Sequence, residues 1–176
     1  MNYEIVLAGF GGQGILFAGK VLAYAGLLDG KEVSWLPSYG PEMRGGTANC
    51  SVCVSDEPIG SPLILEPEIL LAMNTPSFEK FIGTVQPGGK VFVDESMVDV
   101  KTDRTDIDVY YVPATQLAAD NNMNGMANII LLGKLIKETG MFSLDEIKAG
   151  LEKTIPPRKA NLIDTNLAAI KLGMEQ

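Results

Sequence analysis

The chain has 176 residues, of which 46% are apolar and 20% are charged; 14 Lys and Arg against 22 Asp and Glu give a net charge of −8. One compact domain spanning residues 1–176 is expected at this length, and so apolar a composition excludes an intrinsically disordered chain. The acidic excess disfavours binding to nucleic acid or to an anionic membrane surface, because both carry repelling phosphate groups.

The residue types that carry chemistry are scarce. Histidine is absent, which excludes Ser-His-Asp and Cys-His catalytic pairs and histidine metal ligands. The two cysteines are too few for a four-thiolate zinc or iron–sulfur site or a secreted disulfide framework. The N-terminus lacks a basic region and a long apolar run, so we expect no signal peptide or membrane anchor and a cytoplasmic protein.

The first half of the chain alternates strand and helix signals. Residues 3–8 form a β-branched and apolar run, glycines follow over 9–14, and apolar residues then recur at helical spacing from Ile15. This order predicts a strand, a glycine turn and a helix. Further strands are predicted over 32–36, 47–55, 68–73, 90–94 and 109–112, with a helix over 77–85 that Ser77 caps.

From residue 115 onward helical periodicity replaces the strand signals. It predicts helices over 116–121, 126–138, 144–153 and 165–172, and Ser143 with Glu146 forms a capping-box pattern before the third. Strands interleaved with helices predict an α/β fold. The apolar strands indicate a mostly parallel sheet covered by helices on both faces, with a Rossmann-like glycine turn after strand 1 and a helical C-terminal part.

The glycine spacing Gly9, Gly11, Gly14 matches a dinucleotide-binding turn, in which a helix N-terminus faces an anion. That function also requires an acidic residue at the end of the second strand, and here this strand runs into Pro37 and Ser38. The glycine turn therefore either receives another phosphate or simply lets the helix pack closely against the sheet.

The segment 37–48 is the second candidate for a binding site. It follows a strand and is expected at the carboxyl edge of the sheet, beside the glycine turn, where ligand crevices form. Arg44 stands before Gly45 and Gly46, and its guanidinium suits phosphate or carboxylate. The alternative is a surface loop with a solvated arginine.

Three further features have simple structural interpretations. Cys50 and Cys53 lie in a predicted strand, where residues three apart face opposite sides, so buried inert thiols are expected.

The helix from Met126 is apolar on nearly every side, which places it either at the centre of the fold or under another chain. Asn128 is expected as a cap or as a polar contact to that other chain. Residues 156–159 form a basic turn or a solvated loop.

Taken together, these segments resemble the gamma subunit of the 2-oxoacid:ferredoxin (acceptor) oxidoreductases, which act on pyruvate, 2-oxoglutarate or ketoisovalerate. The resemblance spans nearly the whole chain. Its most specific part is the eleven-residue segment Ser38-Tyr39-Gly40-Pro41-Glu42-Met43-Arg44-Gly45-Gly46-Thr47-Ala48. The other matching segments are residues 9–15, 128–132 and 161–173.

The resemblance implies a supporting subunit, inactive alone, of an enzyme that converts a 2-oxoacid and coenzyme A (CoA) into acyl-CoA and CO2. Thiamine diphosphate and Fe-S clusters then lie on alpha, beta and ferredoxin-like subunits, while this chain binds no cofactor alone and helps to enclose CoA. The other partner is ferredoxin or another electron acceptor, and a homodimer is expected when the chain is isolated. The resemblance names no metal ligand and no catalytic residue here. Its candidate cofactor-binding residues are Gly11, Gly12, Gly14, Tyr39, Glu42, Arg44, Gly45 and Asn128.

Two other functions stay open at the level of the sequence. One is a free-standing nucleotide-binding oxidoreductase domain, which the missing acid of the second strand disfavours. The other is a pure assembly scaffold without a ligand.

Overall fold

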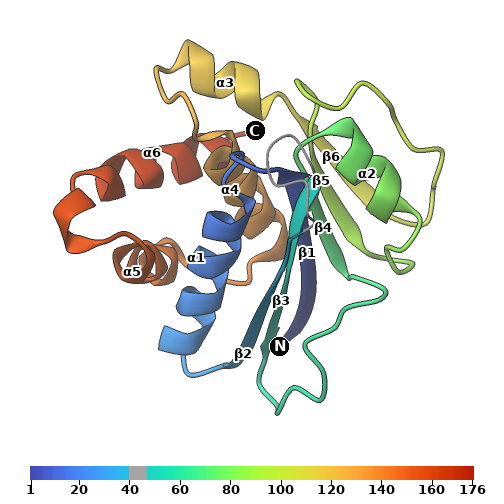
Figure 1. Cartoon of the computed structure of the whole chain (residues 1–176), viewed down its shortest axis with the longest axis horizontal. Helices are drawn as coiled ribbons and strands as arrows, with labels where there is room; N and C mark the ends of the chain where they lie inside the picture. Colours follow the sequence, from blue (N-terminus) through green and yellow to red (C-terminus); the bar gives the residue numbers. More distant parts are fainter. Residues whose placement is uncertain (40–46) are drawn as a thin grey trace.

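The computed structural model describes residues 1–39 and 47–176, which form a six-stranded sheet with helices packed against it (Figure 1). The strands are β1 (Asn2–Phe10), β2 (Glu32–Tyr39), β3 (Thr47–Ser55), β4 (Ile69–Ala72), β5 (Lys90–Asp94) and β6 (Asp108–Val112). Their order is β2-β3-β1-β4-β5-β6, and β3 runs antiparallel to both of its neighbours. Because β1, β4, β5 and β6 pair in parallel, the predicted mostly parallel α/β sheet is confirmed.

The helices divide unequally between the two faces of the sheet. They are α1 (Ile15–Leu28), α2 (Thr75–Ile82), α3 (Ala114–Asp120), α4 (Ala127–Thr139), α5 (Leu144–Thr154) and α6 (Leu162–Met174), with a 3-10 turn, η1, at Pro157–Lys159. Figure 1 shows α1, α4, α5 and α6 on one side and α2 on the other. The larger core lies under the four helices, and a smaller core lies under α2. No helix of the two described ranges is long and apolar enough to cross a membrane.

Helix α4 lies at the centre of the larger core, which is one of the two positions predicted for it, the other being under another chain. Its residues 128–133 are all buried, although Asn128 is polar. Gly133 and Gly173 let α4 and α6 touch backbone to backbone, because a Cβ at either glycine would collide with a carbonyl of the other helix. The apolar surface of α4 is therefore covered within this chain.

Local hydrogen bonds define where two helices begin. Ser143 and Glu146 form the predicted capping box at the start of α5. The prediction that Ser77 caps the helix α2 is wrong: Asn74 is the cap, and its Oδ1 accepts a hydrogen bond of 2.9 Å from the Ser77 N–H. The helix starts earlier because the extended backbone of Asn74 precedes Pro76, which suits a first helical turn.

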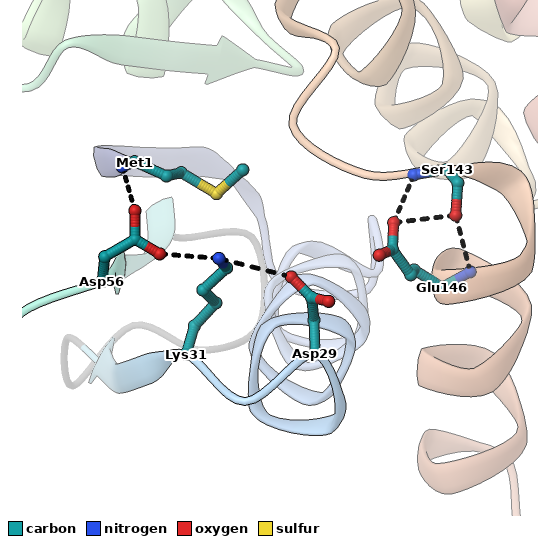
Figure 2. A network of polar contacts seen from close by, with 6 residues as sticks. All are labelled: Met1, Asp29, Lys31, Asp56, Ser143 and Glu146. Atoms are coloured by element: carbon teal, nitrogen blue, oxygen red, sulfur yellow. Dashed lines mark hydrogen bonds and ion pairs between the residues drawn. The ribbon is translucent and has the colours of Figure 1, made fainter.

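A polar network closes the end of the sheet remote from the glycine turn (Figure 2). Asp56, just after β3, accepts hydrogen bonds from the Met1 ammonium and from Lys31, whose Nζ lies 2.6 Å from Asp56 Oδ1. Lys31 also lies 3.6 Å from Asp29 at the end of α1. The Lys31 hydrogen bond is the main reason that the pKa of Asp56 falls to about 2. The network thus joins the end of α1 to the ends of the β2–β3 pair.

Candidate functional site

The glycine turn lies at the point where the strand order changes direction. After β1 the chain passes through α1 to β2 on one side, while the parallel strands β4, β5 and β6 extend on the other. Crevices at such points, beyond the carboxyl ends of the strands, are where α/β proteins bind ligands. Phe10 pairs with Thr47, and Tyr39 pairs with Ala48. Tyr39 and Thr47, the described residues on either side of 40–46, therefore lie at this same edge, as predicted.

Two glycines of the turn are needed for different reasons. Gly12 has a φ of 96°, and no atom lies within 4 Å of the position that a Cβ would occupy. Gly14 has a φ of 72° and caps α1, and its Cβ position is filled by the carboxamide of Asn128. The turn therefore presents open backbone at Gly12 and a close approach between helices at Gly14.

Asn128 connects the starts of α1 and α4. It is 4% exposed, and its Nδ2 donates a hydrogen bond of 2.9 Å to the Gly14 carbonyl. Asn128 thus makes a polar contact, but its partner lies in the same chain and not in the neighbouring chain for which the contact was predicted. Met126, not Asn128, occupies the N-cap position of α4.

The side chain of Gln13 fastens the turn to the end of β4. Its Oε1 accepts hydrogen bonds from the Phe10 N–H at 2.7 Å and from Asn74 Nδ2 at 3.1 Å. Its Nε2 donates to the Met73 carbonyl at 3.1 Å. No sequence pattern predicted this network, although the Asn-Thr-Pro order after the β4 strand is a helix-start signal that points to Asn74.

A pocket of about 220 Å³ opens between the turn and the starts of α3 and α4. Thr115 forms part of its wall and is fixed by the buried Asp94, which accepts from the Thr115 hydroxyl at 2.5 Å and from its N–H at 3.2 Å. Helix N-termini offer free N–H groups that suit an anion. The lining residues are Gly12, Gln13, Met73, Thr115, Ala118, Ala119, Asn124, Gly125, Ala127 and Asn128. Their polar groups are backbone groups, carboxamides and one hydroxyl, which are suited to binding a ligand rather than to transferring a proton.

The structure brings together four of the eight predicted site residues: Gly11, Gly12, Gly14 and Asn128. Tyr39 ends β2 at the same edge, and only its backbone is described. Glu42, Arg44 and Gly45 lie outside the described residues.

The strand order further disfavours a dinucleotide site. In such sites the second strand lies next to the first and carries the acid that holds the ribose. Here β3 separates β2 from β1, and β2 ends in Pro37, Ser38 and Tyr39. Neither the position nor the residue type supports ribose binding.

The two cysteines are buried and unpaired, and they face opposite sides of the sheet as predicted. Cys50 packs under α1 within the larger core, where burial raises its pKa to about 12. Cys53 lies opposite Ser34 and Glu4 and is 2% exposed. No group of three or more potential metal ligands from His, Cys, Asp and Glu occurs within 1–39 and 47–176.

Comparisons with known proteins give a consistent result. The family model described as pyruvate ferredoxin/flavodoxin oxidoreductase matches residues 4–176. The 2-oxoglutarate synthase subunit KorC of Methanocaldococcus jannaschii is 36% identical over 178 residues, with 99% of this chain and 94% of KorC covered. The ketoisovalerate oxidoreductase subunit VorA of Methanothermobacter marburgensis is 37% identical over 98% of this chain, which spans only 36% of VorA.

Two solved structures share the fold. The gamma subunit of a keto/oxoacid ferredoxin oxidoreductase from Geobacter sulfurreducens has a TM-score of 0.83 and 28% identity, with 98% of this chain and 96% of that chain covered. The 2-oxoglutarate:ferredoxin oxidoreductase of Magnetococcus marinus, solved with 2-oxoglutarate, CoA and succinyl-CoA, has a TM-score of 0.87 at 24% identity. The match covers 99% of this chain and 30% of the Magnetococcus chain, and at this sequence identity it shows the fold alone.

Proposed function

The chain belongs to the pyruvate ferredoxin/flavodoxin oxidoreductase family, and from this premise we propose that it is the gamma subunit of a thiamine-dependent 2-oxoacid:ferredoxin oxidoreductase. Such an enzyme oxidatively decarboxylates a 2-oxoacid with CoA to acyl-CoA and CO2. The proposal is supported by matches along nearly the whole length of KorC and of the Geobacter gamma subunit. Its partners are the remaining subunits of the enzyme and ferredoxin or another acceptor.

The role proposed for this chain is to enclose part of CoA at the carboxyl edge of the sheet. The observation that carries this role is the 220 Å³ pocket at the glycine turn, where the N-termini of α1 and α4 meet. The open space in front of Gly12 lets a phosphate approach the backbone closely. Arg44 lies in the segment that begins and ends at this edge and supplies a cation suited to a CoA phosphate.

The thiamine diphosphate and the Fe-S clusters are assigned to the other subunits. The residue chemistry of this chain supports that division, because it has no histidine and only two cysteines. Cys50 and Cys53 face opposite sides of the sheet, so they are not placed to hold one cluster together. We therefore propose that this chain positions CoA and contacts its partners while the bond-making groups lie elsewhere.

The substitution Arg44→Ala tests this role in the enzyme assembled with its companion subunits. Removing the guanidinium is expected to raise the Michaelis constant for CoA about tenfold, the usual effect of losing one charge-assisted hydrogen bond, or to weaken assembly. The matched control is Arg158→Ala, which removes an exposed arginine of η1 and is expected to change neither value. Steady-state kinetics with varied CoA and size-exclusion chromatography of the complex measure both effects, and an unchanged Arg44→Ala enzyme would refute the role of Arg44.

A further inference from the structure

Asn124 differs from the other asparagines of the chain in the residue that follows it. Its neighbour is Gly125, whereas each of the others precedes a residue with a side chain. Asparagine is chemically labile because the backbone nitrogen of the next residue can attack its carboxamide carbon. A side chain on that next residue hinders the attack, and glycine has none. The sequence at Asn124 therefore favours loss of the amide.

Asn124 and Gly125 form the middle of a tight turn between α3 and α4. The Met126 N–H donates to the Met123 carbonyl at 3.0 Å and closes the turn, and Gly125 has a φ of 83°. Both central residues are exposed. Apart from its chain neighbours, no atom lies within 4 Å of the position that a Cβ on Gly125 would occupy. The turn therefore leaves the Asn124 carboxamide and the backbone beside it open to water.

The two groups that would react at this turn are free of hydrogen bonds. Among residues 1–39 and 47–176, neither the Asn124 carboxamide nor the Gly125 N–H has a hydrogen-bond partner. The neighbouring Asn121 and Asn122 are also exposed, but the N–H groups that follow them donate to carbonyls of α3 at 3.2 and 2.7 Å. Each of those N–H groups must give up a hydrogen bond before its nitrogen can attack, and the Gly125 N–H need not.

The buried asparagines are protected by the fold. Asn128 and Asn166 each donate Nδ2 to a backbone carbonyl, and the Asn74 Oδ1 accepts from a backbone N–H. The Oδ1 atoms of Asn128 and Asn166 have no partner in the part of the chain that the structure describes, but they are buried as well. Burial excludes the water that deamidation consumes, so these three side chains keep their amides.

We propose that Asn124 is a site of spontaneous deamidation. The Gly125 nitrogen loses its proton to hydroxide and attacks Asn124 Cγ. The new C–N bond closes a succinimide ring, and the side-chain nitrogen leaves as ammonia. Water then opens the ring at either of its two carbonyl carbons, which gives aspartate or isoaspartate. Water from the solvent is the co-reactant, and the step involves no oxidation or reduction.

Deamidation places a carboxylate in the wall of the pocket at the glycine turn. Asn124 and Gly125 both line that pocket, and none of its lining residues within the described ranges carries a charged side chain. The new negative charge repels a phosphate that approaches Gly12. This consequence for CoA rests on the proposed function, whereas the modification itself depends on the turn alone.

Incubation of the full chain at pH 7, 8 and 9 tests the modification. Peptide mass spectrometry measures the change from amide to acid at each asparagine, and a protein isoaspartate methyltransferase detects the isoaspartate. The peptide that holds Asn124 is expected to convert first, with release of ammonia, and faster as the hydroxide concentration rises. Absence of conversion at Asn124, or equal conversion at Asn121 and Asn122, would overturn the proposal.

A matched pair of variants assigns the released ammonia to its source. Asn124→Gln is expected to abolish the early release, because closure through the longer side chain gives a larger ring that forms slowly. Asn121→Gln makes the same change in the same exposed segment and is expected to keep the early release. Early release that persists in Asn124→Gln would overturn the assignment to Asn124.

Asn124→Asp tests the effect on CoA in the enzyme assembled with its companion subunits. It is expected to raise the Michaelis constant for CoA about tenfold with the turnover number unchanged, by repulsion of a phosphate. Asn121→Asp adds the same charge outside the pocket and is the control. An unchanged Michaelis constant in Asn124→Asp would overturn the effect on CoA and count against the proposed function. The mass spectra decide separately whether Asn124 is modified.

Discussion

At the scale of single residues, Gly14 is where backbone conformation and packing impose the strictest demand. Its φ of 72° disfavours any L side chain, and its Cβ position is occupied by the Asn128 carboxamide. We expect Gly14→Ala to lower the free energy of unfolding by about 3 kcal/mol, combining left-handed strain of about 1–2 kcal/mol with a steric clash. Urea denaturation measures the change.

Gly30 offers the control for the strain alone. It has a φ of 75° and open space around its Cβ position, so Gly30→Ala is expected to cost only about 1–2 kcal/mol. Adding Asn128→Ala to Gly14→Ala removes the clashing group, and the two changes together are expected to cost less than their sum. Equal losses for Gly14→Ala and Gly30→Ala would show that the close approach carries no energetic weight.

Cys50 gives the protein a dependence of stability on alkaline pH. Burial raises its pKa from 9.0 to about 12, so the folded chain keeps a proton between these values that the unfolded chain releases. The unfolded state then binds fewer protons, and stability falls as pH rises from 9, by about 1.4 kcal/mol per pH unit at most. Between pH 7 and pH 10.5, the urea midpoint of the wild type is expected to fall further than that of Cys50→Ala. Parallel pH profiles for the two proteins would refute the assignment.

The site residues found from the sequence are those that a local pattern marks, although the Gly14 partner of Asn128, 114 positions away, was not predicted. Glycines with a forced backbone and a polar residue at a helix start are recognisable from neighbouring residues, as Gly12 and Asn128 illustrate. Gln13 and Asn74 meet across 61 positions of sequence, so no local pattern predicts their hydrogen bond. The unpaired oxygen of Asn166 depends on how α4 and α6 pack, which is likewise a property of the folded chain.

At the scale of elements, hydrophobic periodicity predicted all six strands, and most of the errors lie at the ends. Strand β1 extends two residues further than expected at its carboxyl end, because Gly9 and Phe10 pair with Ala48 and Thr47. Helix α2 begins at Thr75 rather than Ser77, since the Asn74 cap outweighs the propensity of later residues. Helix ends depend on individual hydrogen bonds, whereas helix bodies follow the average pattern of many residues. The 3-10 turn η1 was expected only as a basic turn or loop.

The junction of α1, β2 and β3 is expected to weaken in acid. The pKa of Asp56 is lowered to about 2 by its hydrogen bond to Lys31, so the contribution of this contact is complete above about pH 4 and disappears as pH falls towards 2. The difference in thermal midpoint between wild type and Asp56→Asn is therefore expected to be constant from pH 7 to 5 and to vanish near pH 2. Asp103→Asn, which changes an exposed carboxylate, is the control. A difference that persists at pH 2 would show that the substitution acts through packing instead.

At the scale of the whole molecule, the sequence predicted the layers of the fold but not the order of its strands. The predicted elements determine that strands alternate with helices, and the apolar strands indicate a covered sheet. Strand β3 lies between β2 and β1 because it pairs antiparallel with both of them. Because strand pairing is a long-range property, the pairing of Phe10 with Thr47 and of Tyr39 with Ala48 became visible only in the folded chain.

The surface of the isolated chain carries apolar side chains that a monomer in water would normally bury. Leu27 is 57% exposed at the end of α1, and Leu63 and Leu65 are 66% and 82% exposed in the β3–β4 connection. A groove of about 410 Å³ between α1 and β2 adds Tyr24 and Trp35. In VorA the matching segment is only 36% of a longer polypeptide. These exposed groups therefore suit contacts with partner subunits.

The isolated chain is accordingly expected to self-associate, since two copies can cover apolar surface that the absent partners leave in water. Sedimentation velocity should give a weight-average mass that rises with concentration. The double substitution Leu63→Ser with Leu65→Ser should shift it towards the monomer, because each removed apolar side chain loses about 1.5–3 kcal/mol of burial. Ser61→Ala, in the same connection, is the control. A strict monomer at all concentrations that also binds no hydrophobic dye would contradict the prediction, because such a chain would have no apolar surface in need of a partner.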